Sequence, residues 1–205
     1  MSVVIVDYGV GNLFSLRSSF AAIGETAAVT GDPAAIAAAE RILLPGVGAF
    51  GDAAEKLRRG GLDRAVIAAA EAGTPLLGVC LGMQLLFEKS FEYGEHAGLG
   101  LIPGEVRPIA ERIPPDYKIP HIGWNALDFS GQESPLFRYI KEGDYVYFVH
   151  SFSAVCSEAH TIASAEYGAP LTAAVQRGRV FGCQFHPEKS GNVGLNILKA
   201  FCEIK

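Results

Sequence analysis

Cys80 lies in a segment whose residue types and spacing suit a reactive nucleophile. Residues 78–82 read Gly-Val-Cys-Leu-Gly and join a predicted buried strand, residues 74–79, to a predicted helix, residues 81–88. This G-x-nucleophile-x-G arrangement makes a sharp turn that exposes the central side chain, and the small flanking residues let strand and helix pack closely. The helix N-terminus favours a thiolate. The alternative interpretation is a structural cysteine at the end of a core strand.

A base and an orienting carboxylate follow near the other end of the sequence. His186 comes directly after a predicted strand, residues 180–185, and Glu188 lies two residues further on. In an extended backbone both side chains point the same way, and Pro187 biases His186 towards that conformation. A cysteine nucleophile needs a base, and the base needs an acceptor that orients it. The alternative is a turn histidine beside a solvated glutamate.

A glycine-rich loop offers hydrogen-bond donors for the same chemistry. Hydrolysis of an amide passes through an oxyanion, which requires preorganised N–H groups. The N–H of Leu81 is a natural first donor, because it follows the nucleophile. Gly46, Val47 and Gly48 follow a predicted strand, residues 41–44, and are candidates for the second donor. The alternative interpretation of this loop is an ordinary strand-to-helix turn.

The elements that must position these residues alternate between strand and helix in the first half of the chain. We predict strands at residues 2–6, 26–30, 41–44 and 74–79, and helices at 13–23, after Pro33, and at 52–59, 62–72 and 81–88. Such alternation predicts a parallel sheet covered by helices, with the active site at the carboxyl ends of its strands.

The second half is rich in glycine, proline and aromatic residues and predicts successive short strands. These lie at residues 104–109, 145–152, 161–167, 171–176 and 180–185, before a last helix at about 192–203. The sequence therefore predicts one α/β domain over residues 1–205, whose mostly parallel central sheet is flanked by helices and carries an antiparallel extension.

Composition narrows the class of protein. The chain has 205 residues, of which 49% are hydrophobic and 19% charged, so it can bury a sizeable core. Its net charge of −5 argues against partners such as nucleic acid or an anionic membrane. We expect no targeting segment, a cytoplasmic location and free thiols rather than disulfides at Cys80, Cys156, Cys183 and Cys202.

We predict neither a cofactor nor a metal. Gly9 and Gly11 follow the first predicted strand, but Phe14 stands where a dinucleotide fingerprint needs its third glycine. Cys183 and His186 have the spacing of two zinc ligands, but no second pair completes a site.

Residues 78–84, Gly-Val-Cys-Leu-Gly-Met-Gln, together with His-Pro-Glu at 186–188, resemble the class I (triad) glutamine amidotransferases. The resemblance extends over essentially the whole chain. It implies that Cys80 attacks the carboxamide of glutamine, that His186 transfers protons and that Glu188 orients His186.

The same resemblance implies residues that bind glutamine. Gln84 lies one helical turn past Cys80, on the same face of the predicted helix. Ser151 and Glu92 are the further candidates, and Glu95 is the alternative to Glu92.

Five segments in order are similar to the glutaminase subunits of imidazole glycerol phosphate synthases: residues 7–12, 45–50, 121–125, 147–151 and 186–190. Phe152 departs from the pattern, where tyrosine is expected. The resemblance implies a separate (β/α)8-barrel cyclase subunit, which uses the ammonia to make imidazole glycerol phosphate and an aminoimidazole carboxamide ribotide in histidine biosynthesis.

The implied interface residues are Asn12, Tyr147 and Lys189, each in a segment beside a predicted catalytic residue. A solvated Lys189 and a core Tyr147 are the alternatives. His121 and His150 are expected near the site or the interface, and Trp124 is expected in the core.

Two other functions fit parts of the pattern. A cysteine peptidase can use the same turn, although such enzymes often place histidine directly after the nucleophile, where this chain has Leu81. A catalytically inactive binding module is disfavoured because all three predicted triad residues are present. Release of glutamate from glutamine distinguishes the three hypotheses.

Overall fold

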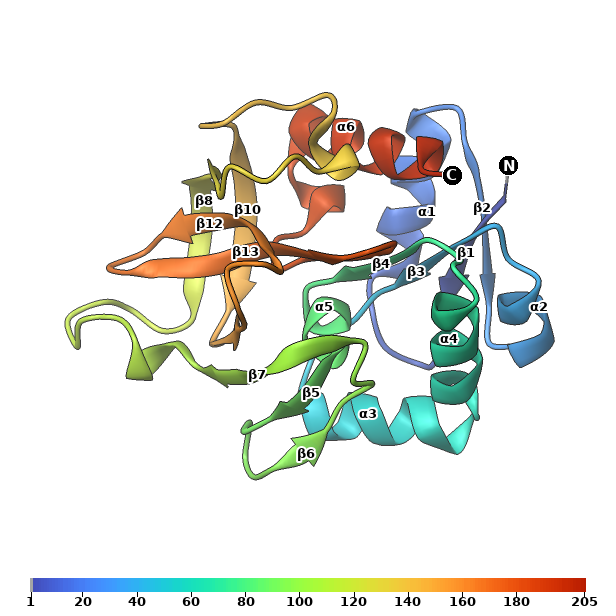
Figure 1. Cartoon of the computed structure of the whole chain (residues 1–205), viewed down its shortest axis with the longest axis horizontal. Helices are drawn as coiled ribbons and strands as arrows, with labels where there is room; N and C mark the ends of the chain where they lie inside the picture. Colours follow the sequence, from blue (N-terminus) through green and yellow to red (C-terminus); the bar gives the residue numbers. More distant parts are fainter. Residues whose placement is uncertain (1) are drawn as a thin grey trace.

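The computed structural model describes residues 2–205 and has a large central sheet with helices on both faces (Figure 1). The order of its strands is β2-β1-β3-β4-β14-β13-β12-β9. The first five pair in parallel: β2 (Thr26–Thr30), β1 (Ser2–Val6), β3 (Arg41–Leu44), β4 (Leu76–Val79) and β14 (Val180–Cys183). The antiparallel extension consists of β13 (Pro170–Arg177), β12 (Thr161–Glu166) and β9 (Asp128–Phe129).

Alternation along the strands builds a core on each face of this sheet. In β1, Val3 and Ile5 pack on one side and Val4 and Val6 on the other, because successive side chains of a strand point to opposite faces. The first face is covered by α1 (Leu13–Ala22) and α6 (Gly191–Glu203). The second is covered by α2 (Pro33–Ala37), α3 (Phe50–Arg59), α4 (Leu62–Glu71) and α5 (Leu81–Leu85).

Two smaller sheets lie beside the central one (Figure 1). One pairs β8 (His121–Ala126) with β10 (Tyr145–His150), and the other has the order β11-β7-β5-β6. The strands of the second are β11 (Phe152–Val155), β7 (Ile102–Pro108), β5 (Phe87–Ser90) and β6 (His96–Ala97). Short 3-10 helices lie at Ile109–Glu111, Pro135–Phe137 and Pro187–Lys189.

The predicted α/β class, with its parallel sheet, flanking helices and antiparallel extension, is confirmed. The prediction of one helix over residues 81–88 was wrong. The helix ends at Leu85, and Phe87 begins a strand, because β5 pairs with β7 and the Phe87 side chain is fully buried there. None of the helices within residues 2–205 is long and apolar enough to cross a membrane.

The predicted strand at 145–152 ends at His150, and its last residue, Phe152, begins β11 in a different sheet. The chain leaves the β8–β10 pair after His150 and joins β7 from Phe152 onwards. The predicted strand at 180–185 stops at Cys183, so that residues 184–186 form the exit from the sheet. β5, β6, β8 and β9 were not predicted, and only Phe152 of β11 was; all of these strands except β8 have at most four residues.

Candidate active site

Cys80 occupies a sharp turn between β4 and α5. Its backbone has φ 54° and ψ −112°, a conformation that side chains other than glycine rarely adopt. The Cys80 N–H donates to the carbonyl oxygen of Cys183, 2.8 Å away on β14, which holds the turn against the sheet. The surrounding structure therefore imposes a strained backbone at the residue that was predicted to be the nucleophile.

The two glycines that flank Cys80 permit this turn. A Cβ atom added to Gly78 would lie 2.7 Å from the carbonyl oxygen of Gly82. A Cβ atom on Gly82 would collide with the carbonyl oxygen of Leu44, at the end of β3. Only glycine lets the start of α5 approach both neighbouring strands.

The strain predicts a measurable difference between two inactive variants. Glycine relieves about 1–3 kcal/mol of backbone strain in the folded state, but it also raises the conformational entropy of the unfolded chain, which opposes folding. Cys80→Gly is therefore expected to be more stable than Cys80→Ala by about 1 kcal/mol. The melting temperature should then be about 2–4 °C higher for Cys80→Gly. A higher melting temperature for Cys80→Ala would contradict the strained conformation.

His186 and Glu188 lie beside Cys80, at the carboxyl end of the adjacent strand. The His186 backbone is extended, with φ −99° and ψ 100°, and its N–H donates to the carbonyl oxygen of Tyr147 at 3.0 Å. His186 Nδ1 lies 2.8 Å from Glu188 Oε1, and His186 lines the same cavity as Cys80. The structure thus brings His186 and Glu188, which are two positions apart, next to Cys80, which lies 106 positions before His186.

The surroundings of His186 favour its protonated form. Burial lowers the pKa of His186, but the hydrogen bonds and negative charges of Cys80 and Glu188 outweigh it and raise the pKa to about 10. The side chains of His186 and Glu188 are only 4% and 1% exposed, so water screens these interactions little. His186 therefore keeps its proton at neutral pH, ready to donate it.

Burial disfavours the thiolate form of the other three cysteines. Burial raises the pKa of Cys156, raises that of Cys202 to about 11, and raises that of the fully buried Cys183 well above the ordinary value of a thiol. All four cysteines are free, as predicted. Because the thiolate is the nucleophile, these three thiols are unsuited to attack a substrate at neutral pH.

Cys80 opens onto a cavity of about 400 Å³, a size that suits a small molecule. Its lining contains residues from all the predicted catalytic and binding segments: Val47, Gly48, Cys80, Leu81, Gln84, Glu92, Pro120, Val149, His150, Ser151, Phe152, His186 and Lys189. Neither Gly46 nor Glu95 is among them.

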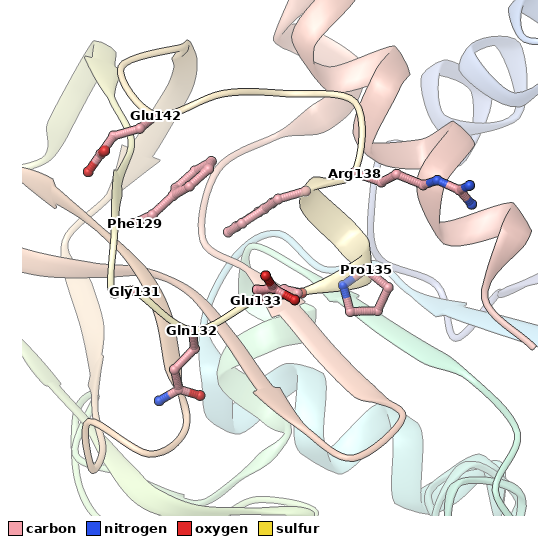
Figure 2. A pocket seen from close by; sticks show the side chains of 9 residues that line it. Phe129, Gly131, Gln132, Glu133, Pro135, Arg138 and Glu142 are labelled. Atoms are coloured by element: carbon pink, nitrogen blue, oxygen red, sulfur yellow. The ribbon is translucent and has the colours of Figure 1, made fainter.

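A larger cavity, of about 890 Å³, lies elsewhere (Figure 2). It is lined mainly by residues between β9 and the segment after Pro135–Phe137, including Phe129, Gln132 and Pro135. It contains no cysteine or histidine, so its lining cannot supply the predicted nucleophile and base.

The loop after β3 lies against the turn at Cys80. A Cβ atom on Gly46 would lie 2.7 Å from the Gly82 nitrogen, so Gly46 packs beneath the cavity rather than in its lining. Val47 is 43% exposed, and Gly48 has φ +92°, which suits glycine. Tyr8, which was not predicted as a site residue, anchors this loop: its hydroxyl donates to the carbonyl oxygen of Pro45 at 2.6 Å.

The binding residues differ in their environments. Glu92 lines the cavity, and its Oε2 accepts a 2.6 Å hydrogen bond from the Phe50 N–H. Burial raises the pKa of Glu92. Glu95 instead lies 3.4 Å from Lys89 at the surface. The geometry favours Glu92 as the carboxylate that a ligand in the cavity would meet.

Gln84 is buried, and its side-chain nitrogen donates twice. The acceptors are the carbonyl oxygen of Phe152, at 3.1 Å, and Oε1 of Gln184, at 3.0 Å. Gln184 is also fully buried, and its Nε2 lies 3.7 Å from Cys80 Sγ. The sequence analysis did not single out Gln184, although it lies two positions before His186.

His121 and His150 form a buried pair, of which His150 lines the cavity. His121 Nδ1 lies 3.0 Å from His150 Nε2, and His150 Nδ1 lies 2.8 Å from the carbonyl oxygen of Phe152. A carbonyl oxygen only accepts, so His150 Nδ1 carries a proton. Burial lowers the pKa of His121, and it lowers the pKa of His150 to about 4.

The lowered pKa of His150 predicts a pH-dependent stability. Between pH 6.5 and about pH 4 the unfolded chain binds a proton at this residue and the folded chain does not. The free energy of unfolding should therefore fall as the pH drops through this range. His150→Asn, which keeps an N–H near the Nδ1 position, should lessen that fall by roughly 2–4 kcal/mol.

Urea unfolding at pH 7.5 and pH 4.5 measures this difference, with His160→Asn as a control because His160 bonds to Ser157 outside the cavity. Equal pH dependence in wild type and His150→Asn would show that His150 is not held neutral.

The predicted interface residues lie in two places. Lys189 is exposed, and its Nζ lies 5.6 Å from the centre of the Tyr147 ring. Asn12 is exposed and caps α1, where its Oδ1 accepts from the Ser15 N–H at 3.3 Å. The prediction that Trp124 lies in the core was wrong: this side chain is 52% exposed on β8.

Trp124 is exposed because β8 and β10 form a sheet of only two strands. Its ring packs edge-on against Tyr147 across the strand pair, with 5.9 Å between the ring centres. Ile122 on the same strand is 57% exposed, and Tyr145 on β10 is 59% exposed. We call Ile122, Trp124 and Tyr145 the β8–β10 apolar group.

Comparison with known proteins agrees with this geometry. The family model "Glutamine amidotransferase class-I" matches residues 4–204. The chain is 50% identical over 202 residues to "Imidazole glycerol phosphate synthase subunit HisH" of Wolinella succinogenes, with 98% of each chain covered. It is 46% identical to the subunit of the same name from Syntrophotalea carbinolica, over 97% of this chain and 98% of that one.

Solved structures show the same fold at low sequence identity. A "glutamine amidotransferase" crystal structure superposes with a TM-score of 0.75 at 18% identity, covering 98% of both chains. PurLQS from Thermotoga maritima gives a TM-score of 0.73 at 19% identity, covering 98% of this chain and 96% of that one. On the family match and the near full-length identity, the chain belongs to the class-I glutamine amidotransferases, and within them to the family of imidazole glycerol phosphate synthase HisH subunits.

Proposed function

We propose that this protein hydrolyses glutamine to glutamate and ammonia as the glutaminase subunit of an imidazole glycerol phosphate synthase. The observation that carries the proposal is the position of His186, which hydrogen-bonds to Glu188 and lines the same 400 Å³ cavity as Cys80. A nucleophile, a base and an orienting acceptor in this order are what covalent hydrolysis of an amide requires.

In the first half of the reaction the Cys80 thiolate attacks the carboxamide carbon of glutamine. The new C–S bond pushes an electron pair onto the carbonyl oxygen. The tetrahedral intermediate collapses, the C–N bond breaks, and His186 gives its proton to the departing nitrogen, which leaves as ammonia. Glu188 accepts the Nδ1–H of His186 throughout, so that Nε2 faces the sulfur and the leaving group.

In the second half water opens the thioester. The neutral His186 takes a proton from the attacking water, the C–S bond breaks, and the thiolate returns beside an imidazolium. The carboxylic acid product loses its proton as glutamate. We assign the stabilisation of both oxyanions to the N–H of Leu81 and to the loop of Gly46, Val47 and Gly48, since Val47, Gly48 and Leu81 line the cavity.

The remaining polar lining suits the rest of the glutamine molecule. We assign Glu92 to the α-ammonium group, because one of its oxygens is engaged by Phe50 and the other is available to a cation. Gln84 and Ser151 are assigned to further polar contacts with the substrate on the same ground, their place in the lining.

Glutamine affinity should therefore depend on Glu92 and not on Glu95. Glu92→Gln, which keeps an oxygen for the Phe50 N–H, is expected to raise the KM for glutamine roughly 10–100-fold through loss of a charge-assisted hydrogen bond. Glu95→Gln should leave KM within about twofold of wild type, as surface ion pairs contribute little. The measurement is the steady-state KM for glutamine with the partner subunit present. A larger rise in KM for Glu95→Gln than for Glu92→Gln would assign the contact to Glu95 instead.

The proposed partner is a (β/α)8-barrel cyclase subunit in the cytoplasm, which receives the ammonia before it can escape. The β8–β10 apolar group supports this assignment, because exposed aromatic and aliphatic side chains beside a catalytic cavity are typical of a protein interface. Lys189 and Tyr147 lie between this group and the triad, and Asn12 is assigned to the same interface. The cyclase would convert the ammonia into imidazole glycerol phosphate and an aminoimidazole carboxamide ribotide.

The function is tested by glutamate release from glutamine in three mixtures: this chain alone, with the cyclase, and with the cyclase and its nucleotide substrate. We expect low activity alone and the highest activity in the third mixture, because docking and ligand complete the site. No glutamate in any mixture would refute the function. Equal full rates in all three would refute coupled activation, and failure of the chains to co-purify would refute the partner.

A further inference from the structure

Gln184 is a fully buried amide that faces the reactive sulfur. It lies directly after β14, and its backbone N–H donates to the carbonyl oxygen of Ala173 at 2.8 Å, so the main chain is held by the neighbouring strand. Burying a side-chain amide is unfavourable unless its polar atoms are hydrogen-bonded. The interactions of this side chain therefore explain its presence at the site.

A backbone carbonyl determines which way the amide points. The oxygen of Phe152 only accepts, so the atom of Gln84 that lies 3.1 Å from it must be the nitrogen. That nitrogen has a second hydrogen, which is directed at the side chain of Gln184 at 3.0 Å and requires an oxygen there. The Gln184 nitrogen is thereby placed 3.7 Å from Cys80 Sγ, as a donor.

Such a donor distinguishes the two forms of cysteine. A thiol sulfur is a weak acceptor, whereas a thiolate accepts strongly, so an N–H at this position favours the thiolate. Unlike His186, the amide neither gains nor loses a proton during the reaction. Its hydrogen bond is therefore available both before the attack and when the thiolate is released from the thioester.

We propose that Gln184 is a further catalytic residue, whose side-chain N–H holds and stabilises the Cys80 thiolate, and that Gln84 positions Gln184 by donating to its oxygen. The proposal rests on the proposed function only in taking Cys80 as the nucleophile. It assigns to Gln184 a role separate from that of His186, since one donor is neutral and the other charged.

The test is the pH profile of Cys80 alkylation by iodoacetamide in the full chain, followed by mass spectrometry of the peptide that contains Cys80. Gln184→Met removes the N–H and keeps an unbranched side chain of similar length. It is expected to move the midpoint of the profile up by about one pH unit, which lowers the rate about tenfold at pH values below the midpoint.

Gln176→Met is the matched control, since Gln176 lies on the neighbouring strand β13 and donates to Gly178 at 3.1 Å, outside the cavity. Its midpoint should be that of wild type. Gln184→Glu serves as a second variant, because it keeps length and an oxygen for Gln84 but places a carboxylate against the thiolate. It should move the midpoint up further.

An unchanged midpoint in either folded Gln184 variant would overturn the proposal. Alkylation requires neither glutamine nor the cyclase, so absence of glutaminase activity would count against the proposed function and leave this test intact. With the cyclase present, Gln184→Met should lower kcat about tenfold with KM nearly unchanged. A rise in KM at unchanged kcat would identify Gln184 as a substrate-binding residue instead.

Discussion

Cys80→Ala is expected to abolish glutamate release, with a loss on the order of 10⁶-fold, as for removal of the nucleophile in other triad enzymes. The variant cannot form the thioester, and the remaining hydrogen-bond donors only orient water and substrate. Its fold should survive, because alanine keeps the Cβ atom at the turn and the main-chain hydrogen bond to Cys183. Activity with the cyclase and the circular dichroism spectrum are the two measurements.

Cys156→Ala is the matched control for this substitution. Cys156 is partly exposed and bonds to Thr161 at 3.3 Å, outside the cavity of Cys80. It should keep wild-type activity, and an electrophilic glutamine analogue should label Cys80 alone. Near-normal glutamate production by folded Cys80→Ala, or preferential labelling of another cysteine, would contradict the assignment of the nucleophile.

His186→Ala is expected to lower kcat by about 10²–10⁴-fold, the usual contribution of proton transfer by a positioned side chain. The loss arises because the substitution removes the group that protonates the leaving nitrogen and activates the water. Glu188→Gln should cost less, since glutamine still offers an oxygen to Nδ1 and loses only the charge. Without that charge the pKa of His186 should fall, and the activity profile should shift to lower pH.

His160→Ala controls for the loss of a histidine outside the cavity and should be as active as wild type. Steady-state turnover with the cyclase, measured from about pH 6 to pH 10, covers both variants. Wild-type turnover by His186→Ala would exclude it as the base, and a larger loss in Glu188→Gln than in His186→Ala would reverse the two roles.

The first half of the fold could be predicted because its signals are local. The predicted bounds of β1, β2 and β3 agree with the structure, and those of α1, α3 and α4 agree to within two residues, since the strands are short apolar runs and a glycine follows each of these helices within two residues. The second half was predicted less well. Its short strands are defined by partners far along the chain, as in the pairing of Phe87 with Ile102 and of Tyr145 with Ala126.

The sequence by itself determined the residues of the predicted triad and the class of the fold. A cysteine between two glycines, and a histidine two positions before a glutamate, can be recognised from the sequence without a structure. The tertiary structure alone decided that Trp124 is exposed, that Glu92 rather than Glu95 lines the cavity, and that Gln184 faces the sulfur.

The physical reason is that hydrogen bonding and burial depend on which segments meet. Gln84 and Gln184 are 100 positions apart, and no periodicity of either segment indicates that their amides touch. Trp124 is a residue type that usually packs in a core, but it is 52% exposed here because it lies on a sheet that has two strands within residues 2–205. Residue type specifies the chemistry that a side chain can perform, and packing decides which side chains are in a position to perform it.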